Sequence, residues 1–333
     1  MAHIAIIGST TWGTTLAIIN SKEGKHVSLL VRTKEESNLL RKHRENKRFL
    51  PGITFPDTLE ITSKSQDLIP KTDLLIMAVP SQTFRKNIRV VSSYVSASTI
   101  IVSASKGLES TSGMRMTEII KEEIPDLSHD NICVLSGPNL SNEILSGKPS
   151  SSVISSINIS TAKSAQSILR CSHLRLYTNT DVIGVEICGA LKNITAIAAG
   201  ICDGLNLGDN TKASIITRGL AEMARFGSAI GAEPSTFSGL AGMGDLIATC
   251  SSGLSRNNQV GRMLAKDMSL NQIEKSMDNV AEGIETAKAV VSVANRLNID
   301  LPIAQAVYNI LFENLSVRNA GEELMGRTLT SEN

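Results

Sequence analysis

The stretch "IAIIGSTTWGTTLA", residues 4–17, joins an apolar run to a turn of small residues and then to a helical pattern. This order of elements is typical of the first turn of a dinucleotide-binding fold, whose fingerprint is G-x-G-x-x-G. The sequence has Gly8 and Gly13 at the outer positions of that fingerprint, but Thr10 at the middle one. Gly8 would give the turn its freedom in φ, and Gly13 would let the helix pack closely on the strand.

The first half of the chain alternates short apolar runs with helical patterns or loops. The apolar runs lie at 4–7, 27–31, 74–79, 99–103 and 132–135, with further ones at 152–156 and 174–177. Runs that are apolar almost throughout indicate strands of a parallel sheet that is buried on both faces. The alternation of strands and helices therefore predicts a Rossmann-like, doubly wound α/β sheet.

From about Asp181 onward the pattern is almost entirely helical. Helical stretches lie at 182–202, 211–230, 258–266, 285–297 and 304–313. The chain has 333 residues, more than the roughly 100–200 of a typical single domain. We therefore expect a dinucleotide-binding domain at 1–180 and an all-α substrate and catalytic domain at 181–333.

Composition excludes several function classes. The net charge is +1 and no polybasic or polyacidic tail is present, which argues against bulk electrostatic binding to nucleic acid. No uninterrupted apolar stretch reaches transmembrane length, so no integral membrane segment is expected. No charged n-region and long apolar h-region precede the first strand, so no signal peptide is expected. The five cysteines are widely spaced, as in reduced thiols of a cytoplasmic protein. The five histidines form no metal-binding motif, so no metal site is predicted.

The second strand ends at Arg32, about 20 residues beyond the turn, where dinucleotide-binding folds often carry an acidic residue for the ribose 2′-OH. An arginine at this place can accept a 2′-phosphate or stack on adenine. The site is therefore expected to favour NADP or to accept both cofactors. The alternative is a surface arginine at the end of a strand.

The stretch "GVEICGALKNITAIAAG", residues 184–200, places Lys192 in the middle of a helix. A glycine inside a helix lowers the stability of the helix by roughly 1 kcal/mol relative to alanine. The presence of Gly189 at this position therefore needs a structural explanation. The small face would leave room for another body to reach the ammonium group; the alternative is a lysine extending out between close-packed helices. The neighbours of Lys192 one turn away are all small: Cys188, Gly189, Thr195 and Ala196.

The stretch "GLAGMGDLIATCSSGLSRNNQVG", residues 239–261, is rich in glycine and small polar residues between helical stretches, and it contains Asp245. Ser255 is the expected N-cap of the next helix, which puts Arg256 and Asn257 in the first turn. Free amides, the positive helix end and a guanidinium group together suit a phosphate monoester. The alternative is a capped helix with exposed polar residues.

Two loops follow the fourth and fifth strands. These are "SASKGLE", residues 103–109, and "SGPNLSNEI", residues 136–144. Ligands of open α/β sheets bind beyond the carboxyl ends of the strands. Lys106 and the turn that contains Gly137 and Asn139 are therefore placed for a ligand site.

Together these stretches resemble the NAD(P)-dependent glycerol-3-phosphate dehydrogenases of the soluble bacterial type. One matching block would be weak evidence, whereas ten blocks in the family's order, from residue 8 to about 290, are specific. The basic run at 41–48 then belongs to a family segment rather than to a nucleic-acid patch. The matching blocks are "GSTTWGT", "HRENKRFLPGITFP", "AVPSQTFR", "SASKGLE", "SGPNLSNEI", "GALKNITAIAAG", "NTKASIITRGLAEM", "GMGDLIATC", "GLSRNNQVG" and "VAEGIETAKAV".

The resemblance implies that dihydroxyacetone phosphate is reduced with NAD(P)H to sn-glycerol 3-phosphate, the backbone precursor of glycerophospholipids, and it suggests a homodimer. It assigns Lys192 as the proton donor and acceptor at the substrate oxygen, with Lys106 and Asp245 beside that oxygen. The substrate-binding residues that it implies are Lys106, Gly137, Asn139, Lys192, Asp245, Ser255, Arg256 and Asn257. The cofactor-binding residues are Gly8, Thr11, Trp12, Gly13, Arg32, Lys106, Ser141, Arg256, Val280 and Glu282.

Physical chemistry adds three expectations to the resemblance. A second lysine and partial burial should lower the pKa of Lys192, and Asp245 should oppose too large a fall. Thr10 replaces the family's middle glycine, so either the turn has an ordinary φ or the cofactor is displaced, and cofactor binding should be weaker. Asn139 replaces the usual Ser or Thr but still offers a donor and an acceptor.

Two rival functions remain at this point. One is another β-hydroxyacid-type dehydrogenase, against which the phosphate-binding residues at 255–257 argue. The other is a non-catalytic nucleotide-binding relative, which only Thr10 favours.

Overall fold

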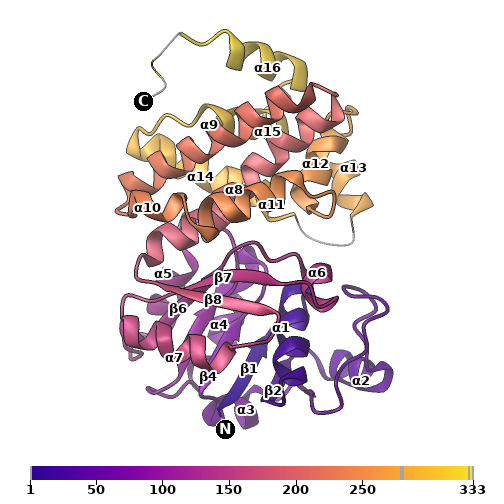
Figure 1. The fold of residues 1–333 in the computed structure, drawn as a ribbon, viewed down its shortest axis with the longest axis vertical. Helices are drawn as coiled ribbons and strands as arrows, with labels where there is room; N and C mark the ends of the chain where they lie inside the picture. Colours follow the sequence, from indigo (N-terminus) through magenta and orange to yellow (C-terminus); the bar gives the residue numbers. More distant parts are fainter. Residues whose placement is uncertain (1, 278–280, 329–330, 332–333) are drawn as a thin grey trace.

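The computed structural model describes residues 2–277, 281–328 and 331 of the chain. Its first part is one eight-stranded sheet with helices on both faces, and its second part is helical (Figure 1). The strand order is β3-β2-β1-β4-β5-β6-β7-β8, and only the β6–β7 pair is antiparallel. The expected doubly wound α/β sheet followed by a helical part is confirmed. The strands are β1 His3–Ile7, β2 His26–Leu30, β3 Glu60–Thr62, β4 Leu74–Met77, β5 Ile100–Ser103, β6 Ile132–Ser136, β7 Ser150–Ser155 and β8 Leu174–Asn179.

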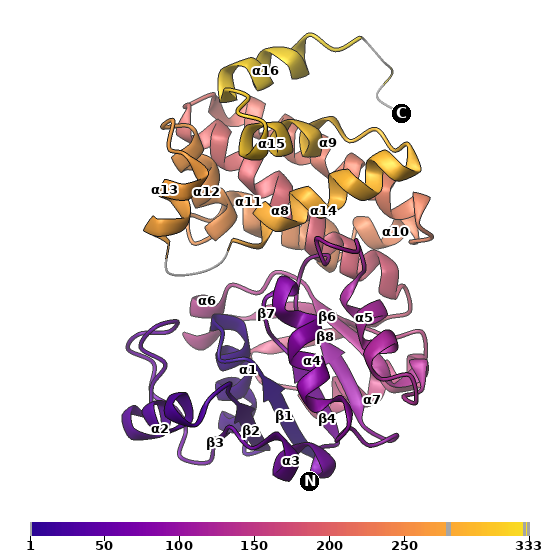
Figure 2. The ribbon, with the colours of Figure 1, turned by 180° about the vertical axis from the view of Figure 1, so that it is seen from behind.

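The sheet is buried on both faces, as its nearly continuous apolar strands predict. In β1, Ile4 and Ile6 belong to one core layer, whereas Ala5 and Ile7 belong to the layer on the opposite face. Helices α1 and α7 contribute to the first layer, and α4 and α5 to the second (Figure 2). The helices of this part are α1 Thr11–Lys22, α2 Lys34–His43, α3 Ser65–Leu68, α4 Phe84–Ser92, α5 Met116–Glu123, α6 Ser141–Leu145 and α7 Ile159–Leu169, with short 3₁₀ turns η1 Ile69–Lys71, η2 Ser81–Thr83 and η3 His129–Asn131.

The sequence prediction missed one strand. The three-residue strand β3 at the sheet edge is too short to show a period of its own. The glycine-rich segment 239–261, for which the sequence predicted a helix only after Ser255, is mostly helical: it holds a π-helical turn, η4 Leu240–Gly244, and the helices that flank Ser252–Ser255. A Cβ on Gly242 would lie 2.1 Å from the carbonyl oxygen of Phe237, so this glycine reflects close packing rather than a flexible loop.

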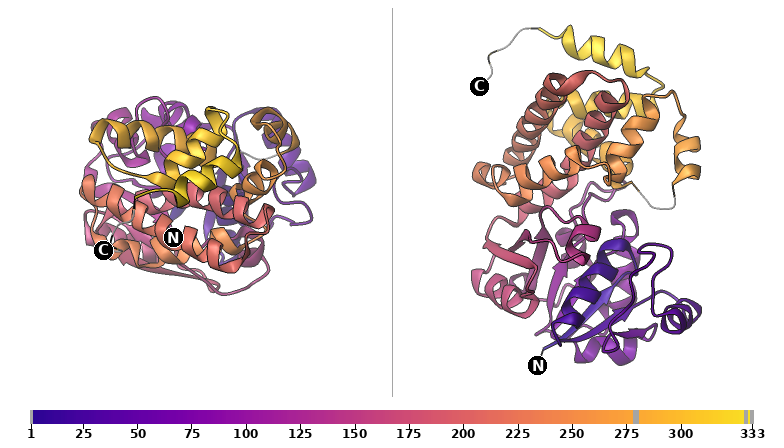
Figure 3. Two further views of the ribbon diagram at one scale, coloured as in Figure 1. Left: turned by 90° about the horizontal axis from the view of Figure 1, so that it is seen from above. Right: turned by 45° about the vertical axis from the view of Figure 1, so that its right-hand side comes forward.

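Helix α8, Val182–Gly204, packs against most of the other helices of the helical part, which lies above the sheet part in the right-hand view of Figure 3. By length and composition α8 could cross a membrane, but 94% of its most apolar window is buried inside the protein. Its polar and charged residues interrupt the apolar run. The other helices of this part are α9 Gly208–Ala229, α10 Pro234–Phe237, α11 Asp245–Ser251, α12 Arg256–Leu264, α13 Leu270–Ser276, α14 Glu282–Leu297, α15 Pro302–Phe312 and α16 Val317–Met325. Those that pack against α8 are α9, α10, α11, α12, α14 and α15.

Helices α8 and α12 are in backbone contact. A Cβ added to Gly261 would lie 2.0 Å from the carbonyl oxygen of Ile197, and one added to Gly200 would lie 2.1 Å from that of Asn258. No side chain fits at either place. This contact fixes the start of α12, at Arg256, relative to the middle of α8.

We predict that Gly261→Ala destabilises the protein by about 1–3 kcal/mol or more, because the backbones of α8 and α12 must separate to admit the methyl group. The midpoint of chemical denaturation measures this loss. Gly321→Ala is the matched control: Gly321 lies in α16 with nothing within 4 Å of its added Cβ, so alanine should be neutral or slightly stabilising. Equal midpoints for Gly261→Ala and the wild type would contradict the close contact.

Candidate active site

A cleft of about 330 Å³ lies between the sheet and the helical part. Its sheet side is built by loops that follow β1, β4, β5 and β6, and its helical side by α8, α11, α12 and the start of α14. The cleft therefore lies beyond the carboxyl ends of the central strands, at the position where open α/β sheets bind ligands.

Two lysines and one carboxylate from distant segments meet at the cleft. Lys106 follows β5, Lys192 lies in the middle of α8, and Asp245 begins α11. Lys192 Nζ donates to Asp245 Oδ1, and Lys106 Nζ donates to Asp245 Oδ2 at 2.6 Å. Lys192 Nζ also donates to Thr249 Oγ1 at 2.7 Å, and Lys106 Nζ to the carbonyl oxygen of Gly137 at 2.9 Å. One carboxylate thus joins an ammonium of the sheet to an ammonium of the helical part.

The two lysines and the aspartate are buried, and this burial shifts the pKa of Lys192. The side chains of Lys106, Lys192 and Asp245 are 17%, 8% and 2% exposed. Burial lowers the pKa of Lys192 to about 8, with the charge of Lys106 acting in the same direction and Asp245 opposing it. The shift has the direction expected from the sequence. An amine with such a pKa can exchange a proton near neutral pH.

Gly189 makes room for a lysine from the other half of the molecule. A Cβ on Gly189 would lie 2.9 Å from Ser136 Oγ and 3.3 Å from Lys106 Cγ. The rest of the small face is filled by helix packing, since Thr195 lies against Gly219 of α9. The small face does leave room for another body at Gly189, as expected, and that body is the stem of Lys106.

The start of α12 has the geometry expected for an anion. Ser255 is the N-cap, and its Oγ accepts from the backbone N–H of Asn258 at 3.3 Å. Arg256 and Asn257 form the first turn, as predicted, and residues 255–257 line the cleft. The Asn257 side chain donates to Asn193 Oδ1 at 2.9 Å and accepts from the N–H of Gly283 at 3.0 Å. It therefore holds α8, α12 and α14 together at the cleft.

Thr10 has an ordinary backbone conformation, with φ −69°. Its Oγ1 accepts from the N–H of Gly13 at 3.1 Å and donates to the carbonyl oxygen of Ala78 at 2.8 Å. Gly8, in contrast, has φ +113°, and a Cβ on Gly13 would lie 2.1 Å from the Gly8 carbonyl oxygen. The turn thus needs its two outer glycines, and Thr10 serves as the N-cap of α1.

Two buried donors at the cleft have no hydrogen-bond partner among the described residues. These are Trp12 Nε1 and Asn139 Nδ2, and both residues line the cleft. Asn139 Oδ1 accepts from Ser152 Oγ, so its amide oxygen is already used. A buried unpaired donor is costly, and the oxygens of a dinucleotide and a phosphorylated substrate would satisfy both. The residues present therefore fit these ligands.

Only some of the other predicted cofactor residues line the cleft. Thr11 and Ser141 line the cleft, and so does Glu282. Glu282 accepts from the N–H of Ser81 at 3.3 Å, and burial raises its pKa. Arg32 is exposed, its N–H donates to Glu36 at 3.2 Å, and it is absent from the described cleft lining. Val280 lies outside the described residues.

Sequence reasoning missed several residues at the cleft. Arg48 and Phe49 line it, with the guanidinium of Arg48 4.9 Å from the centre of the Phe49 ring. They are held there by Asn46, whose Nδ2 donates to the carbonyl oxygen of Ser9 at 2.8 Å. Both residues lie in the sequence block 43–56. That block was matched to the family only as a whole, without a role for any single residue. Thr249, one turn after Asp245, was also missed.

Comparisons with known proteins agree with this geometry. The family model "NAD-dependent glycerol-3-phosphate dehydrogenase N-terminus" matches residues 3–162, and the model of the C-terminus matches residues 181–322. A glycerol-3-phosphate dehydrogenase [NAD(P)+] of Dehalococcoides mccartyi is 46% identical over 100% of this chain and 93% of the relative. The enzyme of the same name from Chlorobium luteolum is 43% identical, with 98% of each chain covered.

A solved structure gives the same result. The crystal structure of glycerol-3-phosphate dehydrogenase from Coxiella burnetii superposes with a TM-score of 0.93 at 34% identity, and it covers 98% of this chain and 99% of its own. The family models match both halves of the chain, and the relatives match it along its full length. The chain belongs to the NAD(P)-dependent glycerol-3-phosphate dehydrogenase family.

Proposed function

We propose that this protein reduces dihydroxyacetone phosphate to sn-glycerol 3-phosphate with NAD(P)H, reversibly. The observation that carries the proposal is the buried Asp245 carboxylate held between Lys106 and Lys192, beside the anion-binding start of α12. The family match along both halves of the chain supports it.

The reaction builds negative charge on the ketone oxygen, which needs a nearby acid and fixed positive charge. The bound nicotinamide supplies the hydride. Lys192 donates its proton to the ketone oxygen, and in the reverse direction its neutral amine takes that proton back. Asp245 and Thr249 orient Lys192 through their hydrogen bonds. Lys106, anchored by the Gly137 carbonyl oxygen, adds a positive charge beside the developing oxyanion.

The phosphate end of the substrate is proposed to bind at the start of α12. The helix N-terminus, the Ser255 cap and the Arg256 guanidinium supply donors and positive charge. Asn139, on the sheet side of the cleft, offers its unpartnered Nδ2. Substrate would therefore be gripped by the helical part and face the nicotinamide held by the sheet part.

Several wider assignments are proposals from the family and the sequence. They are the division of labour between residues 1–180 and 181–333, a homodimer, and a role in glycerophospholipid synthesis. A cytoplasmic location is proposed because all five cysteines are free thiols, as is usual in a reducing compartment. Arg32 is proposed to accept the NADP 2′-phosphate, and its exposure leaves it free to do so.

The direct test of the function is the oxidation of NADH and of NADPH with dihydroxyacetone phosphate, followed by absorbance. Turnover that needs the phosphorylated ketone supports the proposal. Turnover with 2-keto acids in its place, or none with either cofactor, would contradict it.

We predict that Lys192→Arg lowers kcat by about 10²–10⁴-fold, because the proton donor is lost. In the wild type, the reduction rate should fall as the pH rises through about 8, where the ammonium loses its proton, and the oxidation rate should rise over the same range. Arginine keeps its proton there, so the variant should lack this dependence. Lys163→Arg, on the exposed face of α7, is the control; a variant profile identical to that of the wild type would refute the role.

We predict that Arg256→Ala lowers kcat/KM for dihydroxyacetone phosphate by about 10–100-fold, from the loss of a charged hydrogen bond worth about 1.5–3 kcal/mol. Unphosphorylated dihydroxyacetone should be affected little. Arg262→Ala, on the same helix and bound to Asn258 and Asp203, controls for general disturbance of α12. Equal losses for both substrates would place the phosphate elsewhere.

We predict that Thr10→Gly tightens NAD(P)H binding by up to about tenfold, because the missing Cβ lets the phosphates approach the backbone. Thr10→Ser, which keeps both hydrogen bonds, should bind like the wild type. Trp12 is the chain's single tryptophan and lines the cleft, so its fluorescence reports binding directly. Weaker binding by the glycine variant would show that the Thr10 cap matters more than the space.

A further inference from the structure

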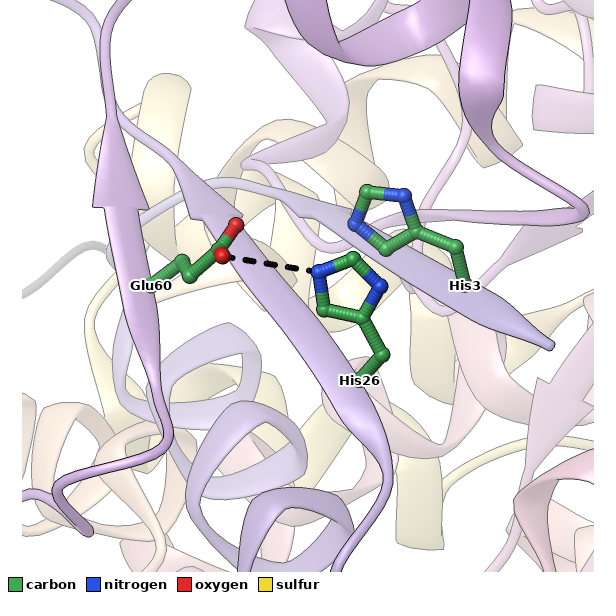
Figure 4. A group of neighbouring side chains, drawn as sticks. All are labelled: His3, His26 and Glu60. Carbon is green, nitrogen blue, oxygen red and sulfur yellow. Dashed lines mark ion pairs between the residues drawn. The ribbon is translucent and has the colours of Figure 1, made fainter. Parts of the chain in front are cut away.

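A second cluster of chemically active side chains lies at the opposite end of the sheet from the cleft. His3 begins β1, His26 begins β2 and Glu60 begins β3. The parallel register pairs His3 with His26, and Ser28 with Glu60. Because side chains alternate along a strand, His26 and Ser28 share a face. The register thus brings two imidazoles and a carboxylate to one face, at the amino ends of three neighbouring strands (Figure 4).

The three side chains are within reach of a single ion. The two imidazole rings stack with their centroids 3.8 Å apart and an angle of 8° between planes. His26 Nε2 lies 3.5 Å from Glu60 Oε1, and in Figure 4 each ring turns one nitrogen toward the Glu60 carboxylate. One ligand atom from each residue can be chosen so that all lie within 4.8 Å of one another. The described part of the chain contains no second group of this kind.

Ser28 links the cluster through hydrogen bonds. His3 Nε2 lies 2.9 Å from Ser28 Oγ, and Ser28 Oγ donates to Glu60 Oε2 at 2.8 Å. These contacts hold one nitrogen of the His3 ring and the Glu60 carboxylate close together on the same face of the sheet.

We propose that His3, His26 and Glu60 form a binding site for a first-row divalent cation of the zinc type. Two imidazole nitrogens and one carboxylate oxygen suit zinc, and they do not suit magnesium or calcium, which take oxygen ligands. His3 is 8% exposed and supplies a fixed ligand. The side chains of His26 and Glu60 are 48% and 60% exposed, so both can move and leave room for water as a further ligand.

The geometry of a zinc site shows which side chains must move when the ion binds. Zinc–nitrogen bonds of about 2.0–2.1 Å in a tetrahedron place ligand atoms about 3.3 Å apart. The chosen ligand atoms lie within 4.8 Å of one another, so the two exposed side chains, His26 and Glu60, must move for all three to reach this spacing. The ion would then tie together the amino ends of β1, β2 and β3. Its effect would be on stability rather than on the reaction, because the cleft lies at the other end of the strands.

The test is a titration of the tag-free, full-length protein with zinc, by calorimetry and by the thermal midpoint. The wild type should bind one equivalent in the micromolar range and gain thermal stability. His26→Gln and Glu60→Gln should each lose the binding by at least tenfold in affinity. His129→Gln removes an exposed histidine in η3 and should bind like the wild type. Unchanged turnover of dihydroxyacetone phosphate in all three variants would show that they are folded.

Cobalt identifies the ligands directly. A cobalt-loaded protein should show visible bands of a nitrogen and oxygen site, without a thiolate charge-transfer band, and these bands should disappear in His26→Gln. A thiolate band would place the metal on a cysteine and overturn the proposal. Absence of binding to the wild type at micromolar zinc, or equal binding to the wild type and to both site variants, would overturn it as well.

Discussion

The active site depends on one buried interaction, the Asp245 carboxylate between the ammonium groups of Lys106 and Lys192. Two like charges at this depth would repel each other, and a buried carboxylate without a positive partner would be costly. Held together, the two ammonium groups and the carboxylate carry a net charge of +1. The pKa of Lys192 in this group is about 8, so this lysine can give up its proton near neutral pH. Because Lys106 belongs to the sheet part and the other two to the helical part, the same interaction fixes the two halves across the cleft.

The surrounding structure can be understood from what this interaction requires. Gly189 removes a side chain from α8 so that the Lys106 stem can pass. The Gly137 carbonyl oxygen accepts from Lys106, and Thr249 accepts from Lys192, so that each ammonium has a second fixed partner. The backbone contact of α8 with α12 at Gly261 sets the distance from Lys192 to the first turn of α12, where the substrate phosphate is proposed to bind. Glycines and small residues in this protein therefore mark places where functional groups come close.

Much of this could be predicted from the sequence, because some signals are local. The outer glycines at the β1 turn, Ser255 as a helix cap and the change from strand to helix near Asp181 each rest on neighbouring residues. What could not be predicted depends on register or packing between distant segments. The stem of Lys106 against Gly189 needs the two halves docked. The His3, His26 and Glu60 cluster needs three strands aligned in parallel, and the histidines, counted by spacing alone, gave no metal motif.

The most direct measurement of the central claim is a crystal structure of the protein with NAD+ and dihydroxyacetone phosphate, a pair that binds but cannot react because both are oxidised. The account predicts the ketone oxygen about 3 Å from Lys192 Nζ, with the substrate phosphate at the start of α12 and the ketone carbon facing the nicotinamide. A ketone oxygen turned away from Lys192, or a phosphate bound outside the turn that Ser255 caps, would contradict it.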